Sequence, residues 1–161
     1  ALLLDAIAIA GQLIVGRMLG AGAAEGAHGA ALRMIGWSVV VGLAFALVLL
    51  PLSHAVPRAF TSDPAVLAQA AKLWPLFALM QPLGGAVFAL DGILIGAGDT
   101  AYLMWSMLAA RAVFIAIASL ALAFHWGIVG VWAGLDVLIA ARLLLLSVRF
   151  AGRRWAVVGY A

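Results

Sequence analysis

Cysteine is absent from the sequence and charged residues are scarce, and each shortage excludes a class of protein. Without cysteine the chain can have no disulfide framework, no thiolate metal site and no cysteine nucleophile. Charged residues make up only 9% of the 161 residues, against about 25% in soluble domains. The histidines, His28, His54 and His125, are scattered and make no metal-ligand spacing. The sequence has no nucleotide-binding loop, zinc-peptidase motif or serine-hydrolase motif, so enzyme chemistry, a bound metal and a cofactor are not expected.

Hydrophobic residues are correspondingly abundant, at 68% of the chain. A soluble fold of this length leaves a large share of its surface in water and could not hide so many apolar side chains. A lipid bilayer removes this difficulty, because it is itself an apolar solvent. In a soluble protein the formal net charge of +3 would suggest nucleic acid as a partner. Here we interpret the basic residues as signals of membrane topology, so the expected partner is the lipid bilayer and not nucleic acid.

Five segments are long and apolar enough, or nearly so, to cross a membrane as helices. A spanning helix needs about 20 mainly apolar residues, and only helices or closed barrels satisfy their backbone groups in lipid. The runs are continuous and lack the alternation of barrel strands, so we predict an all-α, polytopic transmembrane helix bundle. Asp63 followed by Pro64 predicts the start of the third segment, and Pro75 and Pro82 should kink it. The predicted spans are residues 2–19, 32–52, 66–96, 101–124 and 128–150, separated by short glycine-rich breaks such as residues 20–29.

Basic residues beside the short loops predict the orientation of these helices. The side richer in arginine should be cytoplasmic, which places the C-terminus and a tail of residues 151–161 in the cytoplasm. Because the chain opens at Ala1 inside an apolar run, with no basic stretch before it, we expect a truncation within a longer protein and no signal peptide. One side collects Arg17, Arg33, Arg149, Arg153 and Arg154, and the other collects Arg58 and Lys72.

Asp91 is the first candidate for a functional side chain, because ionisable residues within a span are costly and usually mark a substrate, ion or proton path. Steps of three and four residues place it on one helix face with two aromatic side chains, an amide and a glycine. Such a face would suit a cavity for bulky apolar cations. Alternatively, Asp91 forms a hydrogen bond to a neighbouring helix or caps the loop at Gly96. The other members of this face are Phe77, Gln81, Gly84 and Phe88.

Further ionisable residues and an amide lie within the predicted spans. Asp136 is either a coupling carboxylate or half of a structural ion pair. Arg111 lies near the middle of the fourth span, where an unpaired arginine is costly, so we expect Asp91 or Asp136 to pair with it. We favour a structural or gating pair there over direct substrate contact. Asp5 and Gln12 share a face of the first span and are candidates for the same cavity, although Asp5 could instead lie at the outer interface.

Two stretches of the chain resemble the multidrug and toxic compound extrusion (MATE) transporters, in the DinF-like branch. Residues 81–107 read QPLGGAVFALDGILIGAGDTAYLMWSM, and in that branch a helix ends in a similar QPxxxxxFxxDGxxxGAxD pattern. Residues 5–22, DAIAIAGQLIVGRMLGAG, are similar to the branch's eighth helix, including the positions of Asp5, Gln12 and Gly16-Arg17. The resemblance covers essentially the whole chain, in the right order.

The resemblance implies twelve helices in two six-helix lobes, with this chain supplying the eighth to twelfth helices, which are most of the C-terminal lobe. Its partners would be a small organic substrate and the N-terminal lobe of the same chain. Family members export drugs, dyes or organic metabolites in exchange for protons or sodium, by alternating access between the lobes. By the resemblance, Asp5, Gln12 and Asp91 occupy polar positions of the C-lobe cavity, whereas the best-supported coupling carboxylate of the family lies in the N-lobe. The acid that forms a sodium site in some branches corresponds to a position near Gly84, so protons are favoured over sodium as the coupling ion.

The sequence therefore predicts a proton-coupled efflux antiporter of the cell membrane. One alternative is a flippase-like exporter of lipid-linked or polysaccharide substrates, which should carry more cationic residues in its cavity than Arg111 alone. Another is a non-transporting membrane subunit, in which Asp5, Asp91, Arg111 and Asp136 could be neutralised without loss of activity.

Overall fold

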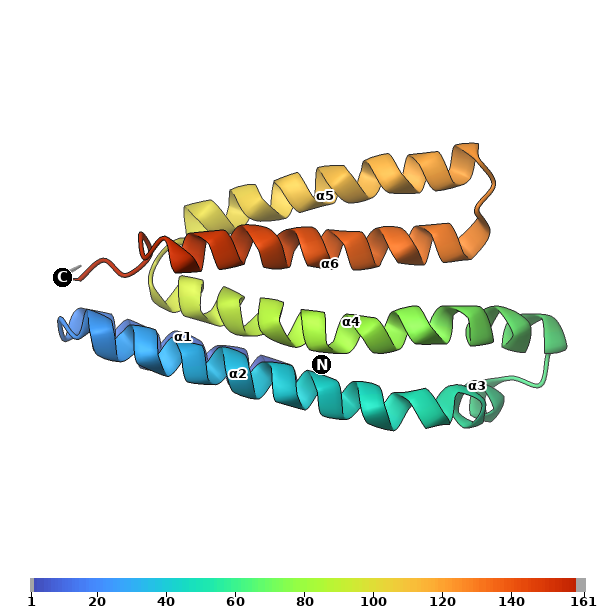
Figure 1. Cartoon of the computed structure of the whole chain (residues 1–161), viewed down its shortest axis with the longest axis horizontal. Helices are drawn as coiled ribbons and strands as arrows, with labels where there is room; N and C mark the ends of the chain where they lie inside the picture. The colour runs from blue at the N-terminus through green and yellow to red at the C-terminus, as the bar shows by residue number, and fades with distance from the viewer. Residues whose placement is uncertain (1, 159–161) are drawn as a thin grey trace.

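The computed structural model describes the backbone of residues 2–158 and the side chains of residues 4–158. This part of the chain is helical and contains no strand, which confirms the predicted all-α helix bundle. Figure 1 shows the long helices lying side by side along the longest axis of the molecule. The elements are α1 (Leu2–Gly20), α2 (Ala24–Leu49), a short 3₁₀ helix η1 (Leu50–Ser53), α3 (Ala55–Phe60), α4 (Pro64–Gly96), α5 (Thr100–Ala123) and α6 (Gly127–Ala151).

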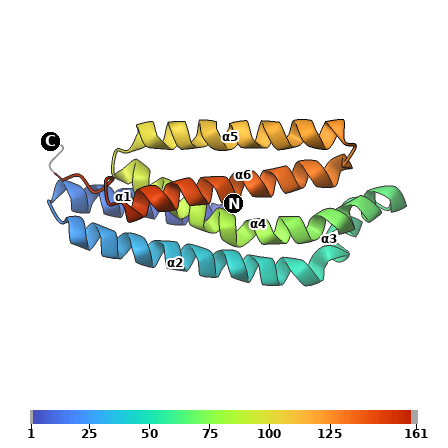
Figure 2. The same ribbon diagram turned by 45° about the horizontal axis from the view of Figure 1, so that its top comes forward.

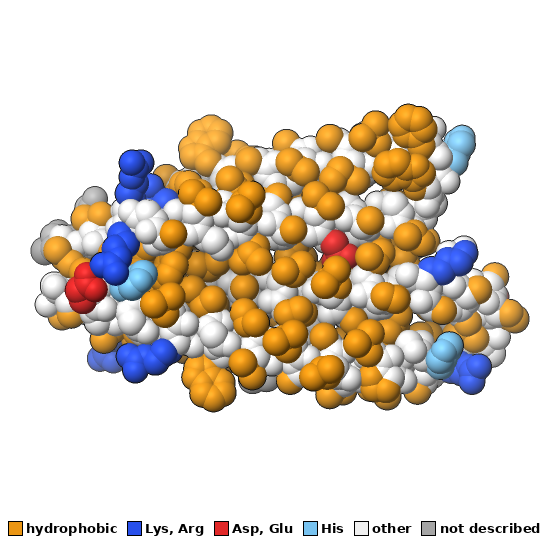
Figure 3. All heavy atoms as spheres, viewed as in Figure 1, with side chains coloured by type: hydrophobic (Ala, Val, Ile, Leu, Met, Phe, Trp, Pro, Cys, Tyr) orange, Lys and Arg blue, Asp and Glu red, His pale blue; other side chains and the backbone are white. Residues whose placement is uncertain are grey.

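The helices have the length and composition of membrane spans. Four helical segments of the described chain are long and apolar enough to cross a bilayer: Ala24–Ser53, Pro64–Gly96, Thr100–Ala123 and Gly127–Ala151. They correspond to four of the five predicted spans. The remaining helix, α1, has 19 residues and is not among the four, so its crossing of the membrane stays a prediction. In Figure 3 hydrophobic side chains cover the middle of the face, and most Lys and Arg side chains gather near its two ends.

The second helix begins earlier than the sequence predicted. A break over residues 20–29 was expected, but the turn between α1 and α2 is short and α2 already begins at Ala24. The turn closes as many helix ends do, with Gly22 in the left-handed region at a φ of 76° and the amide of Ala23 donating to the Met18 carbonyl. Gly26 and Gly29, assigned to the break by the sequence, lie inside α2. The alanines and the glutamate that surround Gly26 favour helix, and Ala27 is fully buried in the core.

Local signals correctly predicted where α4 begins. The backbone amide of Ala65 donates to the Asp63 carboxylate at 2.8 Å, so Asp63 caps the helix and Pro64 is its first residue. The helix then continues through Pro75 and Pro82 to Gly96 without a break in its assignment. Its ribbon bends along its length in Figure 2, in keeping with two prolines inside one helix.

Helix α4 is the centre of the bundle. It packs against α1, α2 and α6, and Figure 1 shows α1 and α2 on one side of it and α6 on the other, while α5 packs mainly on α6. Contact with α1 is close because α4 lacks side chains where the two helices meet: a Cβ on Gly92 or on Gly96 would collide with the carbonyl oxygens of Ala8 and Gln12. The apolar core lies in the half of the bundle near the ends of α1 and α4, which we call the inner end. Its fully buried members include Val15, Leu90, Ile93, Leu94 and Leu146.

Candidate functional site

Asp91 and Arg142 form an ion pair that joins α4 to α6. Nη2 of Arg142 donates to Oδ1 of Asp91 at 2.7 Å, and the two side chains are only 12% and 22% exposed. The expectation that Arg111 would pair with Asp91 or Asp136 is wrong. Arg111 lies on an exposed face of α5, and α5 touches α4 much less than α6 does. Arg142 reaches Asp91 instead because its helix packs directly on α4.

Asp136 is buried on α6 and stands apart from this pair. The residue is 8% exposed, and neither carboxylate oxygen has a hydrogen-bond partner among the described residues. It follows Trp132 by one turn, and the ring of Trp132 meets Phe77 of α4 edge-on, with ring centroids 6.3 Å apart. Along α6, Asp136 therefore lies between two contacts with α4, the aromatic one and the Arg142 ion pair. It is a buried carboxylate with no balancing donor in this part of the protein.

The α4 face that contains Asp91, which the sequence predicts to line a cavity, is covered by α6 at two positions and open at others. Phe77 contacts Trp132 and Asp91 contacts Arg142, as described above. By contrast, Phe88 is 37% exposed, and a Cβ added to Gly84 would meet nothing within 4 Å. The amide of Gln81 is half-buried and donates to the backbone carbonyl of Phe77 at 3.0 Å, so its nitrogen is occupied within its own helix. At Gly84 and Phe88 this face of α4 is therefore not covered by the rest of the described chain.

The candidates on α1 are not joined to this set. Asp5 is half-buried and Gln12 is exposed, and no hydrogen bond links either side chain to another residue within the described part. Gln12 does lie against α4, but through its backbone at Gly96. Among residues 4–158 no group of three His, Asp or Glu side chains could hold a metal ion.

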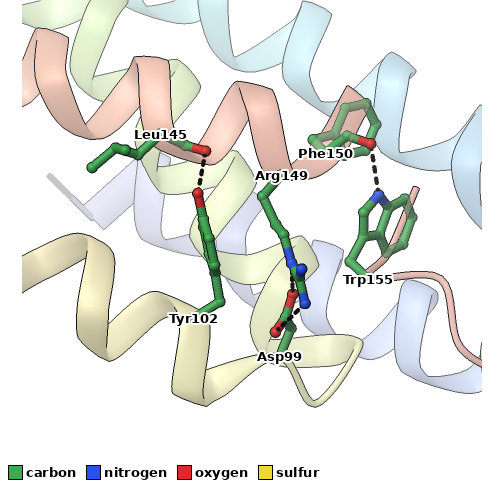
Figure 4. A network of polar contacts seen from close by, with 6 residues as sticks. All are labelled: Asp99, Tyr102, Leu145, Arg149, Phe150 and Trp155. Carbon is green, nitrogen blue, oxygen red and sulfur yellow. Dashed lines mark hydrogen bonds and ion pairs between the residues drawn. The ribbon is translucent and has the colours of Figure 1, made fainter. Parts of the chain in front are cut away.

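A polar network at the inner end was missed by the sequence analysis. Asp99, in the turn after α4, accepts from Arg149 through both oxygens, at 2.6 Å from Nε and 3.1 Å from Nη2 (Figure 4). The guanidinium carbon of Arg149 also lies 4.9 Å from the centre of the Tyr102 ring, and the Tyr102 hydroxyl donates to the Leu145 carbonyl at 2.7 Å. The sequence analysis assigns Arg149 only to membrane topology. The available hint was an Asp at the end of the GAxD pattern on the same predicted side of the membrane.

Comparison with known proteins decides the family. The model of the MatE family matches residues 2–122, which run from α1 almost to the end of α5. The chain belongs to the MatE family. The matched stretch contains Asp5, Gln12, Gln81, Asp91 and Arg111, whereas Asp136 and Arg142 lie beyond it. The resemblance found in the sequence is confirmed at the level of this family, and the DinF-like branch stays a prediction.

Several MatE relatives come from the plant Arabidopsis thaliana. Protein DETOXIFICATION 43 is 31% identical over 150 residues, covering 93% of this chain and 28% of the relative. Protein DETOXIFICATION 42 is 32% identical over 145 residues, covering 88% and 27%. Protein DETOXIFICATION 17 is 29% identical over 154 residues, covering 91% and 31%. The chain thus spans less than a third of the length of each of these relatives, and no solved structure matches it significantly.

Proposed function

We propose that this MatE chain supplies most of the C-terminal lobe of a secondary antiporter. The full protein would export drugs, organic cations or metabolites in exchange for protons, or less favourably sodium, by alternating access. The observation that carries the proposal is the family match, together with a carboxylate and an ion pair held inside apolar spans. Charges at such depth are expensive and are usually retained for a transport path.

The two carboxylates of α4 and α6 would take different parts in this function. The charge of Asp91 is balanced within the lobe by Arg142, so this pair can fix the position of α6 against α4. Asp136 has no such partner among the described residues, which leaves it available to an ion or a substrate group. The open positions of α4 at Gly84 and Phe88 would face the rest of the transporter, where the cavity between the two lobes is expected.

We further infer a multi-pass protein of the cell membrane with a cytoplasmic C-terminus. The arginines near the inner end support this orientation, because short loops rich in Arg and Lys remain in the cytoplasm. No cofactor is needed for such a transporter beyond its coupling ion.

A flippase-like exporter of lipid-linked or polysaccharide substrates is the second candidate. Such a protein should present several free cationic side chains to its anionic substrate. Arg142 is neutralised by Asp91, which leaves Arg111 as the other arginine well inside a span. The shortage of free arginines within the spans favours the antiporter over the flippase. A non-transporting subunit is the third candidate, and the experiment below separates the antiporter from both alternatives.

The test is energised dye uptake by inverted membrane vesicles that carry the full-length protein. An imposed proton gradient should drive uptake of a cationic dye by the wild type, and Asp91→Asn should abolish it. The Asp63→Asn variant is a matched control, because it removes a carboxylate that lies at a helix cap before α4. Unimpaired uptake by variants of both Asp91 and Asp136 would contradict the proposed path. Absence of uptake under proton and sodium gradients with several dyes would favour the flippase or the subunit.

The double variant Asp91→Asn/Arg142→Gln separates a structural role of Asp91 from a direct one. It removes both charges of the pair and leaves no arginine unbalanced. If the double variant regains the transport that Asp91→Asn loses, Asp91 acts by holding α6 in place. If it remains inactive while folded, the carboxylate itself is required.

A further inference from the structure

A cavity of about 370 Å³ opens at the inner end of the bundle. Its walls come from three parts of the chain that are distant in sequence: the last turns of α1, the turn between α4 and α5 with the end of α4, and the last turn of α6 with the segment that follows it. The residues that matter below are Gly20, Gly98, Asp99, Arg149, Arg154 and Trp155. The cavity lies away from Asp91 and Asp136, so it is separate from the candidate transport site.

The cavity carries an excess of positive charge. Asp99 is its one acidic lining residue, and both carboxylate oxygens of Asp99 are occupied by Arg149 (Figure 4). Arg149 uses Nε and Nη2 for this contact, and its Nη1 has no hydrogen-bond partner within residues 4–158. Arg154, the second basic lining residue, forms no ion pair or hydrogen bond with the described side chains. Two guanidinium groups with unused donors therefore border one space.

The walls leave room for a ligand and are firmly held. Gly20 and Gly98 line the cavity with backbone alone, and a Cβ added at either would meet nothing within 4 Å. The absence of side chains at these two positions keeps the space open. On another side Trp155 is only 1% exposed, donates from Nε1 to the Phe150 carbonyl at 3.0 Å, and stacks on the Phe150 ring at 5.2 Å. The cavity is thus a preformed feature of the fold.

The position of the cavity favours a membrane lipid as its occupant. The cavity lies where α1 and α4 end, and the ends of spanning helices lie at the level of the lipid headgroups. Basic pockets between helix ends bind anionic headgroups, and guanidinium groups match the geometry of a phosphate. We propose that this cavity binds the phosphate-bearing headgroup of an anionic glycerophospholipid, with Arg154 and the free Nη1 of Arg149 as donors.

The experiment measures thermal stabilisation of the purified full-length protein in a neutral detergent. Short-chain phosphatidylglycerol should raise the denaturation midpoint in a saturable manner, because a ligand that binds only the folded state stabilises it. Short-chain phosphatidylcholine and inorganic phosphate at equal concentrations should give little shift. Arg154→Gln should raise the half-saturating concentration of phosphatidylglycerol about tenfold, which is the loss expected for one charge-assisted hydrogen bond.

Two further variants make the test specific to the cavity. Arg153→Gln removes the same charge from the neighbouring residue, but Arg153 pairs with Glu25 at 2.6 Å and does not line the cavity, so binding should be retained. Gly20→Leu changes no charge and fills the space, so it should abolish the phosphatidylglycerol shift.

Three results would overturn the proposal. The first is the absence of a saturable shift with phosphatidylglycerol in the wild type. The second is equal weakening by the Arg153 and Arg154 variants, which would indicate general surface charge. The third is an equal shift with inorganic phosphate, which would make the ligand a free anion. None of these depends on transport, so the proposed function can stand or fall separately.

Discussion

Gly84 and Gly85 are adjacent in α4, and the structure predicts opposite effects of replacing each with alanine. A Cβ at position 85 would lie 2.5 Å from the carbonyl oxygen of Ser38 in α2, well inside the 3.4 Å at which ordinary contact begins. Ser38 is itself buried, so α2 has little freedom to move away. A Cβ at position 84 would meet nothing within 4 Å.

The expected magnitudes follow from this geometry. Forcing a methyl group into a packed contact typically costs about 1–3 kcal/mol, and the obstacle here is backbone, which cannot rotate away as a side chain does. We therefore expect Gly85→Ala to destabilise by a value near the upper end of that range. Gly84→Ala has no contact to displace and should be neutral or stabilise by up to about 1 kcal/mol, the difference in helix propensity between the two residues.

Thermal denaturation of the purified full-length protein, followed by loss of the monodisperse peak in size-exclusion chromatography, measures both effects. A change of 1 kcal/mol shifts the midpoint by about 2–4 °C in proteins of 150–250 residues, and by less in larger ones. The Gly85 variant should fall by several degrees and the Gly84 variant should not fall. Equal midpoints for the two variants, or a larger loss at Gly84, would refute the packing of α2 on α4 described above.

Two other predictions concern carboxylates. Asp91→Asn leaves Arg142 without its partner and should lower stability by up to about 3–5 kcal/mol, whereas Asp136→Asn strands no described donor and should change it by less than about 1 kcal/mol. The same denaturation assay compares them, and a larger loss for Asp136→Asn would contradict the pairing. Asp63→Ala removes the side chain that caps α4 and should lower the free energy of unfolding by about 1 kcal/mol. Ser62→Ala is the control, because the neighbouring Ser62 does not form the cap hydrogen bond. Equal midpoints for these last two variants would show that the cap contributes nothing.

The start of α4 could be predicted because its signals are local. Asp63 and Pro64 act within the first turn of the helix. The end of α4 is also a local feature, because Gly98 in the left-handed region stops the helix by its own backbone geometry. The start of α2 could not be placed in the same way. There, glycines occur both in the turn and in the first turns of the helix, so the local sequence does not distinguish the two. The helical part is distinguished by the burial of residues such as Ala27, which depends on the tertiary fold.

The partner of Asp91 was beyond local reasoning. Arg142 lies 51 residues further along the chain, and which arginine reaches Asp91 depends on how α6 is rotated against α4. In a soluble helix an apolar stripe reveals the packed face, but a membrane helix is apolar all round and carries little of this information. The expectation that Arg111 pairs with Asp91 or Asp136 rests only on its predicted depth near the middle of a span. The contact between Asp99 and Arg149, 50 residues apart, was missed for the same reason.

We propose that the full protein to which this MatE chain belongs exchanges an organic substrate for protons. Proteoliposomes containing the full-length protein and a preformed pH gradient test it most directly, with an internal pH-sensitive dye as the readout. Adding a cationic substrate should dissipate the gradient in these vesicles and leave it intact in protein-free liposomes. A gradient that persists with every substrate tried, while the reconstituted protein is folded, would contradict proton-coupled antiport.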